Sequence, residues 1–324
     1  MKDLPTQLAV ELGGHQGPVR AVRFNRNGNY CMTCGNDKTV KLWNPHRQLL
    51  IKSYGGHGME VLDADASHDN NRIASAGADK IVQLIDVGTG QVVRKIRGHL
   101  ERVNCVKFNE ESTMVLSGSY DATVKAWDLR SRATDPVQVM DEAKDSVSSL
   151  QLSRHEILTG SVDGCVRKYD IRMGTLLVDN VKQPVTCVSF SHDGHCILVS
   201  TLDNKLLLLD KDNGDLLNSY EGHVSSSYKL DSCVSHTDAY IVSGSEDGRI
   251  CFWDLVEGNL VHNLQHFGHK EKPSKKIASG EGGTVVYSLS YHPRHPCLLS
   301  VGAQGPVKLW KGPEWNNDSD EEET

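Results

Sequence analysis

The sequence predicts an all-β fold, a seven-bladed β-propeller in which each blade is built from four antiparallel strands. Two observations predict it: a motif of about 42 residues that recurs seven times, and short strand-like segments joined by turn sequences. The segments at residues 19–24, 103–108 and 185–190 are rich in β-branched and aromatic residues, and Asn-Gly or Asp-Gly pairs mark turns. No segment shows a sustained period of 3.6 residues, so helices are not expected.

The seven repeats are counted from the spacing of a few polar and aromatic residues. Gly-His pairs place His15, His57 and His99 at intervals of 42 residues, and an aspartate follows each histidine by 22 residues. Six residues after each aspartate comes a large side chain, and this register continues to the end of the chain. The seven large residues are Trp43, Ile85, Trp127, Tyr169, Leu209, Trp253 and Trp310. Blades four, five and seven lack parts of the polar pattern and are expected to depend more on apolar packing.

Composition argues against several classes of function. The net charge is −7, and five of the negative charges lie between residues 318 and 323, which leaves a body near −2. Duplex nucleic acid demands a strongly basic surface, which this chain lacks. No run of 18 apolar residues is present, so a transmembrane span is not expected. The first residues carry an early acid and no apolar core, so no secretory signal is expected.

The cysteines and paired histidines do not form a metal-binding pattern. Nine scattered cysteines, an odd number without a paired framework, indicate a reducing compartment. Cys31 and Cys34 form the one CxxC, which lies in an expected strand, where positions three apart point to opposite faces. The His292/His295 pair has no carboxylate or cysteine nearby in the sequence, so surface imidazoles are the favoured interpretation. We therefore expect no metal, cofactor or small-molecule substrate.

The recurring residues resemble those of the WD-repeat family, in which histidine, serine or threonine, aspartate and tryptophan form a buried hydrogen-bond network within a blade. The resemblance implies complete sets of four (tetrads) at His15, Thr33, Asp37 and Trp43, at His99, Ser117, Asp121 and Trp127, and at His223, Ser243, Asp247 and Trp253. Blade two would hold His57, Ser75 and Asp79, with Ile85 in place of tryptophan. Serine, histidine and aspartate also form hydrolase triads, but a catalytic site is normally single and this set recurs. No enzymatic activity is expected.

The resemblance also organises the chain into domains. Residues 1–312 form a single propeller, and residues 6–12 would supply the outer strand of the last blade, which closes the ring and removes exposed sheet edges. Residues 262–283 contain four lysines and are expected to form a basic loop between blades six and seven. Residues 313–324 are expected to be a disordered acidic tail. Ser319 is followed by acids, so it is a candidate for an acid-directed kinase, and a solvated tail without a role is the alternative.

Within the WD-repeat proteins, the chain is most similar to the mitogen-activated protein kinase organizer family. The stretches that carry the resemblance include residues 21–25, 28–31, 41–45, 90–95, 160–164, 169–174, 228–231 and 253–258. The resemblance implies a non-catalytic scaffold for the extracellular signal-regulated kinase cascade that is also a component of the spliceosome. It further implies protein partners in cytoplasm and nucleus, and a monomer within larger assemblies. Direct RNA contact would be minor, through the basic loop.

Two surfaces are candidates for binding partners. WD-repeat propellers often bind at the narrow top face, and the resemblance carries this role to Arg20, Asn36, Glu60, Leu62, Arg102, Asn104, Tyr120, Ser148 and Glu246. Arginine and tyrosine are enriched at interface hot spots. Trp-Asp-Leu-Arg ending at Arg130 and Tyr-Asp-Ile-Arg ending at Arg172 resemble the boxes of cullin ubiquitin-ligase substrate receptors. The alternative is that both arginines leave a strand end and pair locally.

Overall fold

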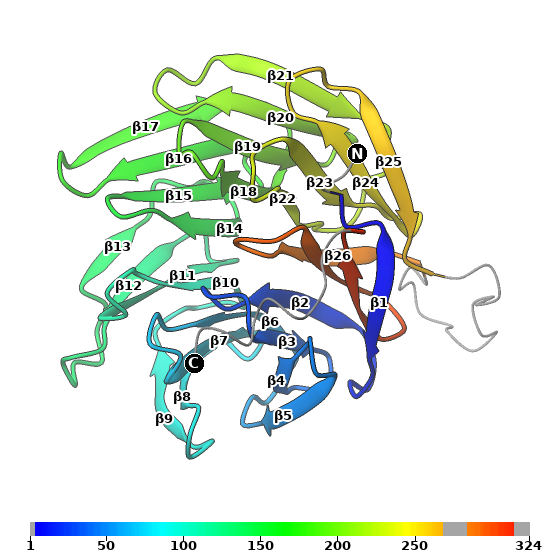
Figure 1. Ribbon diagram of the computed structural model, residues 1–324. Coiled ribbons are helices and arrows are strands. Elements are labelled where there is room, and N and C mark those ends of the chain that lie inside the picture. Colours follow the sequence, from blue (N-terminus) through cyan, green and yellow to red (C-terminus); the bar gives the residue numbers. More distant parts are fainter. Residues whose placement is uncertain (1–3, 268–283, 314–324) are drawn as a thin grey trace.

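The computed structural model describes residues 4–267 and 284–313 and contains seven four-stranded antiparallel sheets arranged around a central axis (Figure 1). The described residues form 28 strands and no helices. The prediction of an all-β, seven-bladed propeller is therefore confirmed. The described part of the chain has no helix that is long and apolar enough to cross a membrane.

Blades one to six follow the sequence order, each from its innermost to its outermost strand. Blade one contains β2 (Val19–Phe24), β3 (Cys31–Gly35), β4 (Val40–Asn44) and β5 (Leu49–Tyr54). Blade two contains β6 (Val61–Ala66), β7 (Arg72–Gly77), β8 (Ile81–Asp86) and β9 (Val92–Arg97). Blade three contains β10 (Val103–Phe108), β11 (Met114–Ser119), β12 (Val124–Asp128) and β13 (Gln138–Met140).

The remaining blades repeat this order, except for the last outer strand. Blade four contains β14 (Val147–Leu152), β15 (Glu156–Ser161), β16 (Cys165–Asp170) and β17 (Thr175–Asn180). Blade five contains β18 (Val185–Phe190), β19 (Cys196–Thr201), β20 (Lys205–Asp210) and β21 (Leu216–Glu221). Blade six contains β22 (Ser232–Val234), β23 (Tyr240–Gly244), β24 (Arg249–Asp254) and β25 (Leu260–Gln265). Blade seven contains β26 (Val286–Tyr291), β27 (Cys297–Gly302), β28 (Val307–Lys311) and β1 (Gln7–Leu12).

The N-terminal strand closes the ring, as expected from the sequence. In Figure 1 the blue β1 lies against the red strands of blade seven. Its register pairs Leu8 with Trp310 and Val10 with Leu309. Val10 and Leu12 are buried in a cluster that also holds residues of blades one and seven. The first and last parts of the chain therefore share one sheet, and their separation would open an edge of the ring.

The apolar core lies between the blades. Ala74 and Val82 of blade two pack in one cluster with Val103, Val115 and Trp127 of blade three. Comparable clusters join the other neighbouring blades. Each sheet therefore buries both faces against its neighbours, which explains why the inner strands are apolar on both faces and do not alternate strictly.

Side chains of one blade satisfy inner-edge amides of the next. The backbone N–H of Val22 donates to Ser288 Oγ at 3.1 Å, and that of Phe24 donates to Ser290 Oγ at 3.0 Å. Carboxylates do the same between blades two and three, where Asp65 accepts the N–H of Phe108 at 2.8 Å. The innermost strands have no further strand on their axial side, so these bonds satisfy amides that would otherwise be left unpaired.

The outer strands are interrupted by β-bulges. In blade one Leu42 pairs with Lys52 and Trp43 with Leu50, so Ile51 is left as the extra residue. The same register shift occurs in blades two, five and six. A bulge twists an edge strand away from flat pairing, which protects the edge from joining another chain.

The insertion before blade seven begins later than the sequence indicated. β25 continues through Gln265, so residues 262–265 belong to a strand and not to the expected loop 262–283. The rest of that loop, from residue 268, lies outside the described residues. Residues 314–324 of the expected acidic tail lie outside them as well.

Candidate functional site

Each face of the propeller carries its own set of turns. The top face holds the turns that enter each innermost strand and the turns between second and third strands. The bottom face holds the turns between first and second and between third and fourth strands. The expected tetrads lie near the top face within the blades, and the two boxes with arginine lie at the bottom.

Blades one and three contain complete tetrads. In blade three, His99 Nδ1 lies 2.9 Å from Asp121 Oδ2 and its Nε2 lies 2.8 Å from Ser117 Oγ. Trp127 Nε1–H donates to the same Ser117 oxygen at 2.9 Å. In blade one the corresponding distances are 2.8 Å (His15 to Asp37), 2.7 Å (His15 to Thr33) and 2.8 Å (Trp43 to Thr33). The serine or threonine hydroxyl is the shared centre of each network.

Burial and hydrogen bonding together shift the pKa values of these groups. Burial lowers the pKa of His99 below its usual value, although the neighbouring Asp121 carboxylate acts in the opposite direction. Burial also opposes ionisation of Asp121, but hydrogen bonds from Thr123, Leu100 and His99 outweigh it and lower the pKa of that carboxyl. Ser117 is fully buried, and its oxygen already receives the tryptophan N–H. A substrate therefore cannot approach this serine. The hydrogen-bonded tetrad instead stabilises the structure of the blade.

Blade two contains the reduced set. His57 Nδ1 lies 3.0 Å from both carboxylate oxygens of Asp79, and Nε2 lies 2.8 Å from Ser75 Oγ. Ile85 stands where blades one and three place tryptophan and is buried. The histidine bridge therefore forms without the indole.

Blade six departs from the expected tetrad. The Trp253 Nε1–H donates to the backbone carbonyl of Glu221 at 2.9 Å, and the Ser243 hydroxyl donates to the carbonyl of Gly244 at 3.0 Å. Asp247 pairs with Arg249 at 2.6 Å, while His223 Nδ1 is buried without a hydrogen bond. The expectation of a complete network in this blade was wrong.

Two sequence differences explain blade six. The spacing from His223 to Asp247 is 24 residues instead of 22, and Arg249 stands two residues after the aspartate, where blades one and three have threonine. The Arg249 guanidinium pairs with the Asp247 carboxylate in place of His223, because a hydrogen bond between two charged groups is stronger than one from a neutral imidazole. Burial accordingly lowers the pKa of His223 to about 4.

Blade seven contains a histidine that the sequence interpretation missed. His266 is fully buried, its Nδ1 lies 2.9 Å from Ser300 Oγ, and Trp310 Nε1–H donates to the same oxygen at 2.7 Å. The insertion that follows His266 places this histidine 38 residues before Gln304. The 22-residue spacing between histidine and aspartate in blades one to three therefore does not reveal it. Blade seven therefore has three members of a tetrad and does not depend on apolar packing alone.

Blade four replaces the histidine by an arginine. Arg167 of β16 contacts Asp163 at 2.6 Å, and both side chains are buried. Burial opposes ionisation of Asp163, but Arg167 and the backbone N–H of Lys144 outweigh it and lower the pKa of Asp163 to about 2. The sequence shows this arginine at the place of Lys41 and Lys125, and only the structure shows it turned onto the aspartate.

The top face presents two arginines that stack on tyrosines. The Arg102 guanidinium lies 4.7 Å from the ring centroid of Tyr120, which is 50% exposed. Arg20 lies 4.9 Å from the ring of Tyr287. Arg20 Nε donates to Asn36 Oδ1 at 2.9 Å, and the guanidinium pairs with Glu60 at 3.2 Å. These contacts hold the planar groups in place before any partner arrives.

Other residues predicted for the top face have different surroundings. Ser148 is buried and donates to Val185 O at 2.6 Å, so it is not available to a partner. The amide of Asn104 donates to Ser146 and to the carbonyl of Val147. Leu62 is half-buried in β6. The candidate surface therefore reduces to the two arginine–tyrosine pairs and their acidic and amide neighbours.

Glu246 organises the loop beside the surface. Its carboxylate accepts the backbone N–H groups of Ser226 and Ser227 at 2.7 Å and that of Tyr228 at 3.0 Å. Burial opposes its ionisation, but these N–H groups outweigh burial and lower its pKa. Tyr228 packs edge-on against Tyr287 at 5.8 Å. Glu246 therefore acts on the surface through the loop that it holds.

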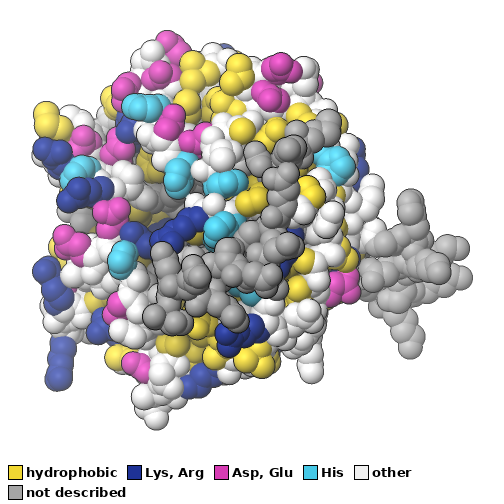
Figure 2. All heavy atoms as spheres, viewed as in Figure 1, with side chains coloured by type: hydrophobic (Ala, Val, Ile, Leu, Met, Phe, Trp, Pro, Cys, Tyr) yellow, Lys and Arg dark blue, Asp and Glu magenta, His cyan; other side chains and the backbone are white. Residues whose placement is uncertain are grey.

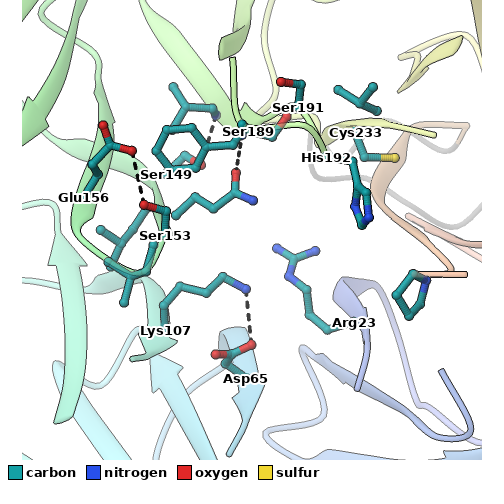
Figure 3. Close-up of a pocket in the computed structure, with 18 of the residues that line it drawn as sticks. Arg23, Asp65, Lys107, Ser149, Ser153, Glu156, Ser189, Ser191, His192 and Cys233 are labelled. Atoms are coloured by element: carbon teal, nitrogen blue, oxygen red, sulfur yellow. Dashed lines mark hydrogen bonds and ion pairs between the residues drawn. The ribbon is translucent and has the colours of Figure 1, made fainter. Parts of the chain in front are cut away.

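The bottom face opens into a central cavity of about 1230 Å³. Figure 3 shows Arg23 and Lys107 extending into it, with Lys107 3.3 Å from Asp65. Arg23 pairs with Asp63 at 3.1 Å and Asp231 at 2.7 Å, so two carboxylates face its one positive charge. Within the part of the chain that the structure describes, no group of three or more histidine, cysteine or acidic side chains could hold a metal.

Comparison with known proteins assigns the chain to a family. Residues 60–238 match the family described as Nucleolar protein 10-like, N-terminal domain, and residues 6–44 match the family described as WD domain, G-beta repeat. The WD repeat domain-containing protein 83 of Rattus norvegicus is 54% identical over 309 residues, which cover 95% of this chain and 93% of the rat protein. The chain belongs to the WD-repeat β-propeller family.

More distant WD-repeat relatives cover nearly the whole chain too. The protein of the same name from Xenopus tropicalis is 52% identical over 316 residues, covering 98% of this chain and 96% of that protein. The WD repeat domain-containing protein 83 homolog of Dictyostelium discoideum is 31% identical over 328 residues, covering 92% of this chain and 96% of that protein. WD-repeat domains typically bind other proteins.

The two arginine boxes of this WD-repeat chain lie at the bottom face. Arg130 pairs with Asp128 at 3.2 Å while its side chain remains 71% exposed. Arg172 is exposed and lines the mouth of the central cavity. The local pairing considered for both arginines is therefore present at Arg130, and it leaves that guanidinium accessible.

Proposed function

We propose that this WD-repeat protein is a non-catalytic scaffold that organises the extracellular signal-regulated kinase cascade and takes part in pre-mRNA splicing. It works in both cytoplasm and nucleus, as a monomer within larger assemblies. Membership of the WD-repeat family supports the scaffold role, and the resemblance of stretches such as residues 169–174 to the mitogen-activated protein kinase organizer family supports the cascade. The solvent-inaccessible hydroxyls of Thr33, Ser75 and Ser117 argue against a hydrolase.

The stacked pair Arg102–Tyr120 is the observation that carries the proposal. Tyr120 is half-exposed while its ring is fixed by the guanidinium, so little side-chain entropy is lost when a partner covers it. Arg20 over Tyr287 provides a second, more buried pair on the same face. Rigid aromatic and arginine groups of this kind are typical of interface hot spots.

Affinity capture with mass spectrometry tests the proposal, using separate nuclear and cytosolic fractions. The bait is the full chain, beside an Arg102→Glu, Tyr120→Ala variant and a matched bottom-face variant, Arg130→Ala, Arg172→Ala. We expect kinase-cascade proteins in the cytosolic capture and splicing proteins in the nuclear capture, both lost only with the top-face variant. Their retention by the top-face variant, or their absence from every capture, would contradict the proposal.

The exposure of Arg130 and Arg172 favours a second candidate, a substrate receptor of a cullin ubiquitin ligase. Two guanidiniums on the same face could contact a ligase adaptor. Under this alternative the bottom-face variant loses the adaptor while the top-face variant keeps it. Unchanged capture of the adaptor by the bottom-face variant eliminates the candidate.

A further inference from the structure

The bottom turns of blades seven and one form a patch that is rich in basic residues and free of acids. The patch consists of the turns 25–30, 45–48 and 292–296, which contain three arginines, three histidines and no aspartate or glutamate; the six basic residues are Arg26, His46, Arg47, His292, Arg294 and His295. None of the three arginines forms a salt bridge with a described residue. Figure 2 shows histidine, lysine and arginine side chains near the middle of the face that it views.

Contacts between the blades fix the geometry of this patch. The His292 ring lies 5.1 Å from Phe24 and 4.8 Å from His295, measured between ring centroids. His46 Nε2 lies 3.2 Å from the carbonyl oxygen of Gly28. A Cβ on Gly28 would fall 1.8 Å from His292 Nε2, so the turn of blade one fits against this imidazole only because it has no side chain there. The turn 25–30 therefore contacts both other turns of the patch.

His292 is held neutral at the centre of the patch. Its Nδ1 accepts the backbone N–H groups of Arg294 at 3.1 Å and His295 at 3.0 Å, which requires an unprotonated nitrogen. Burial, followed by the positive charges of neighbouring groups, lowers the pKa of His292 to about 3. The positive charge of the patch therefore comes from its three arginines, which an anion would stabilise.

The bottom turns of blades five and six have the opposite character. The turns 191–195, 211–215, 235–239 and 255–259 contain three histidines, one lysine and five acids; the charged residues are Asp193, Asp212, Asp215, Asp238, Glu257 and Lys211. The bottom face is thus electrically polarised from one side of the ring to the other. An acidic segment that reaches this face would be directed to blades seven and one.

The chain leaves the described structure at this patch. The N–H of Gly312 donates to the carbonyl oxygen of Pro296 at 2.8 Å, which places the last described residue, Pro313, beside the turn of Arg294 and His295. The sequence that follows contains no lysine or arginine, and its acids are Glu314, Asp318, Asp320, Glu321, Glu322 and Glu323.

We propose that the segment 314–324 docks on this patch of its own propeller, its carboxylates pairing with the arginines of the turns. Eleven residues can span at most about 36–40 Å when extended, which is enough to reach across neighbouring blades. Attachment beside the patch raises the effective concentration of the segment to about the millimolar range, so modest ion pairs suffice. Phosphate on Ser319 would add charge and strengthen docking.

The docked segment competes with acidic or phosphate-bearing partners for the same arginines. This inference is independent of the scaffold role proposed for the top face, because it uses none of the same residues.

Fluorine NMR of the full chain labelled with 5-fluorotryptophan tests the proposal. Of the five tryptophans, Trp43, Trp127, Trp253 and Trp310 are buried in the blades, so the signal of Trp315 reports on the segment alone. Replacement of Trp315 by phenylalanine assigns that signal. At low salt we expect a broad Trp315 signal that narrows several-fold at about 1 M salt, where the screening length falls to about 3 Å.

Charge reversal separates this docking from other contacts. The Arg26→Glu, Arg294→Glu variant should give the narrow Trp315 signal at low salt, while the matched Arg130→Glu, Arg172→Glu variant keeps the broad one. The four buried tryptophans serve as an internal control that both variants fold. A narrow Trp315 signal in the unmodified chain at low salt, or a broad one that ignores the Arg26 and Arg294 reversals, would overturn the proposal.

Discussion

At the scale of single residues, a buried hydroxyl joins an imidazole and an indole in three blades. Ser117, Thr33 and Ser300 each accept an N–H from a tryptophan and contact a histidine nitrogen. The hydroxyl suits this place because it can both donate and accept, whereas the indole N–H only donates. In blades one and three the histidine also links this hydroxyl to the aspartate of the turn near the top face.

Replacing Ser117 by alanine should destabilise the protein by about 1–3 kcal/mol, because the N–H of Trp127 and the Nε2 of His99 lose their partner in a buried site. Ser227→Ala, on an exposed top-face loop, should change stability by less than about 0.5 kcal/mol. Denaturant titration of both variants measures the difference. Equal stability of the two variants would show that the shared hydroxyl is dispensable.

The buried histidines make stability depend on pH. Burial lowers the pKa of His266 and His292 to about 3, of His223 to about 4, and that of His99 by a smaller amount, whereas an unfolded histidine titrates near 6.5. Below about pH 6.5 the unfolded chain binds more protons than the folded one, so the free energy of unfolding falls as the pH falls. Each such histidine contributes up to about 1.4 kcal/mol per pH unit in this range.

Calorimetry between pH 7.5 and pH 4.5 should therefore show a Tm that falls steadily with decreasing pH. A His266→Gln variant removes one of these groups, so its Tm should start lower and depend less steeply on pH. A Tm that stays constant or rises towards pH 5 would contradict this linkage.

At the scale of elements, the blades share one strand order but are stabilised by different polar contacts. The strands could be predicted from local periodicity. The ring closure and the networks of blades one to three were implied by the resemblance to WD-repeat proteins, whose residues recur here at a fixed spacing. Insertions break the spacing, which is why His266 was not found and why His223 was wrongly expected to bridge to Asp247. Arg167 could not be assigned from sequence, because an arginine in a strand can point to solvent or to a buried carboxylate. The patch of basic residues depends on which turns adjoin in space, which no repeat spacing reveals.

Blade four tests whether an ion pair can replace the histidine–aspartate contact of blades one to three. Replacing Arg167 by methionine leaves the buried Asp163 carboxylate without its cation and should cost about 3 kcal/mol. An Asp163→Ser, Arg167→Met double variant removes both charges and should recover much of the loss. Chemical unfolding measures all three chains, and a single variant as stable as the parent would show that the pair does not stabilise the blade.

At the scale of the whole molecule, the ring depends on its first strand. Deleting residues 1–12 exposes the edge of β28 and removes the buried Val10 and Leu12, each worth about 1.5–3 kcal/mol. We expect a lower Tm and aggregation that increases with concentration, as measured by calorimetry and light scattering. Leu8→Lys, at a side chain that is 46% exposed on the same strand, should leave both properties unchanged. A deleted chain that remains monomeric with the parental Tm would contradict closure by β1.

The ring is closed and is stabilised by buried hydrogen bonds and apolar packing, so its surface groups are held in place before a partner binds. This rigidity is the physical basis for the proposed scaffold. Hydrogen exchange with mass spectrometry, on the full chain alone and bound to a captured partner, tests this directly. We expect slower exchange in the top-face segments around Arg102 and Tyr120 and no change in the bottom turn around Arg130. Protection confined to the bottom turns, with the top-face segments unaffected, would contradict it.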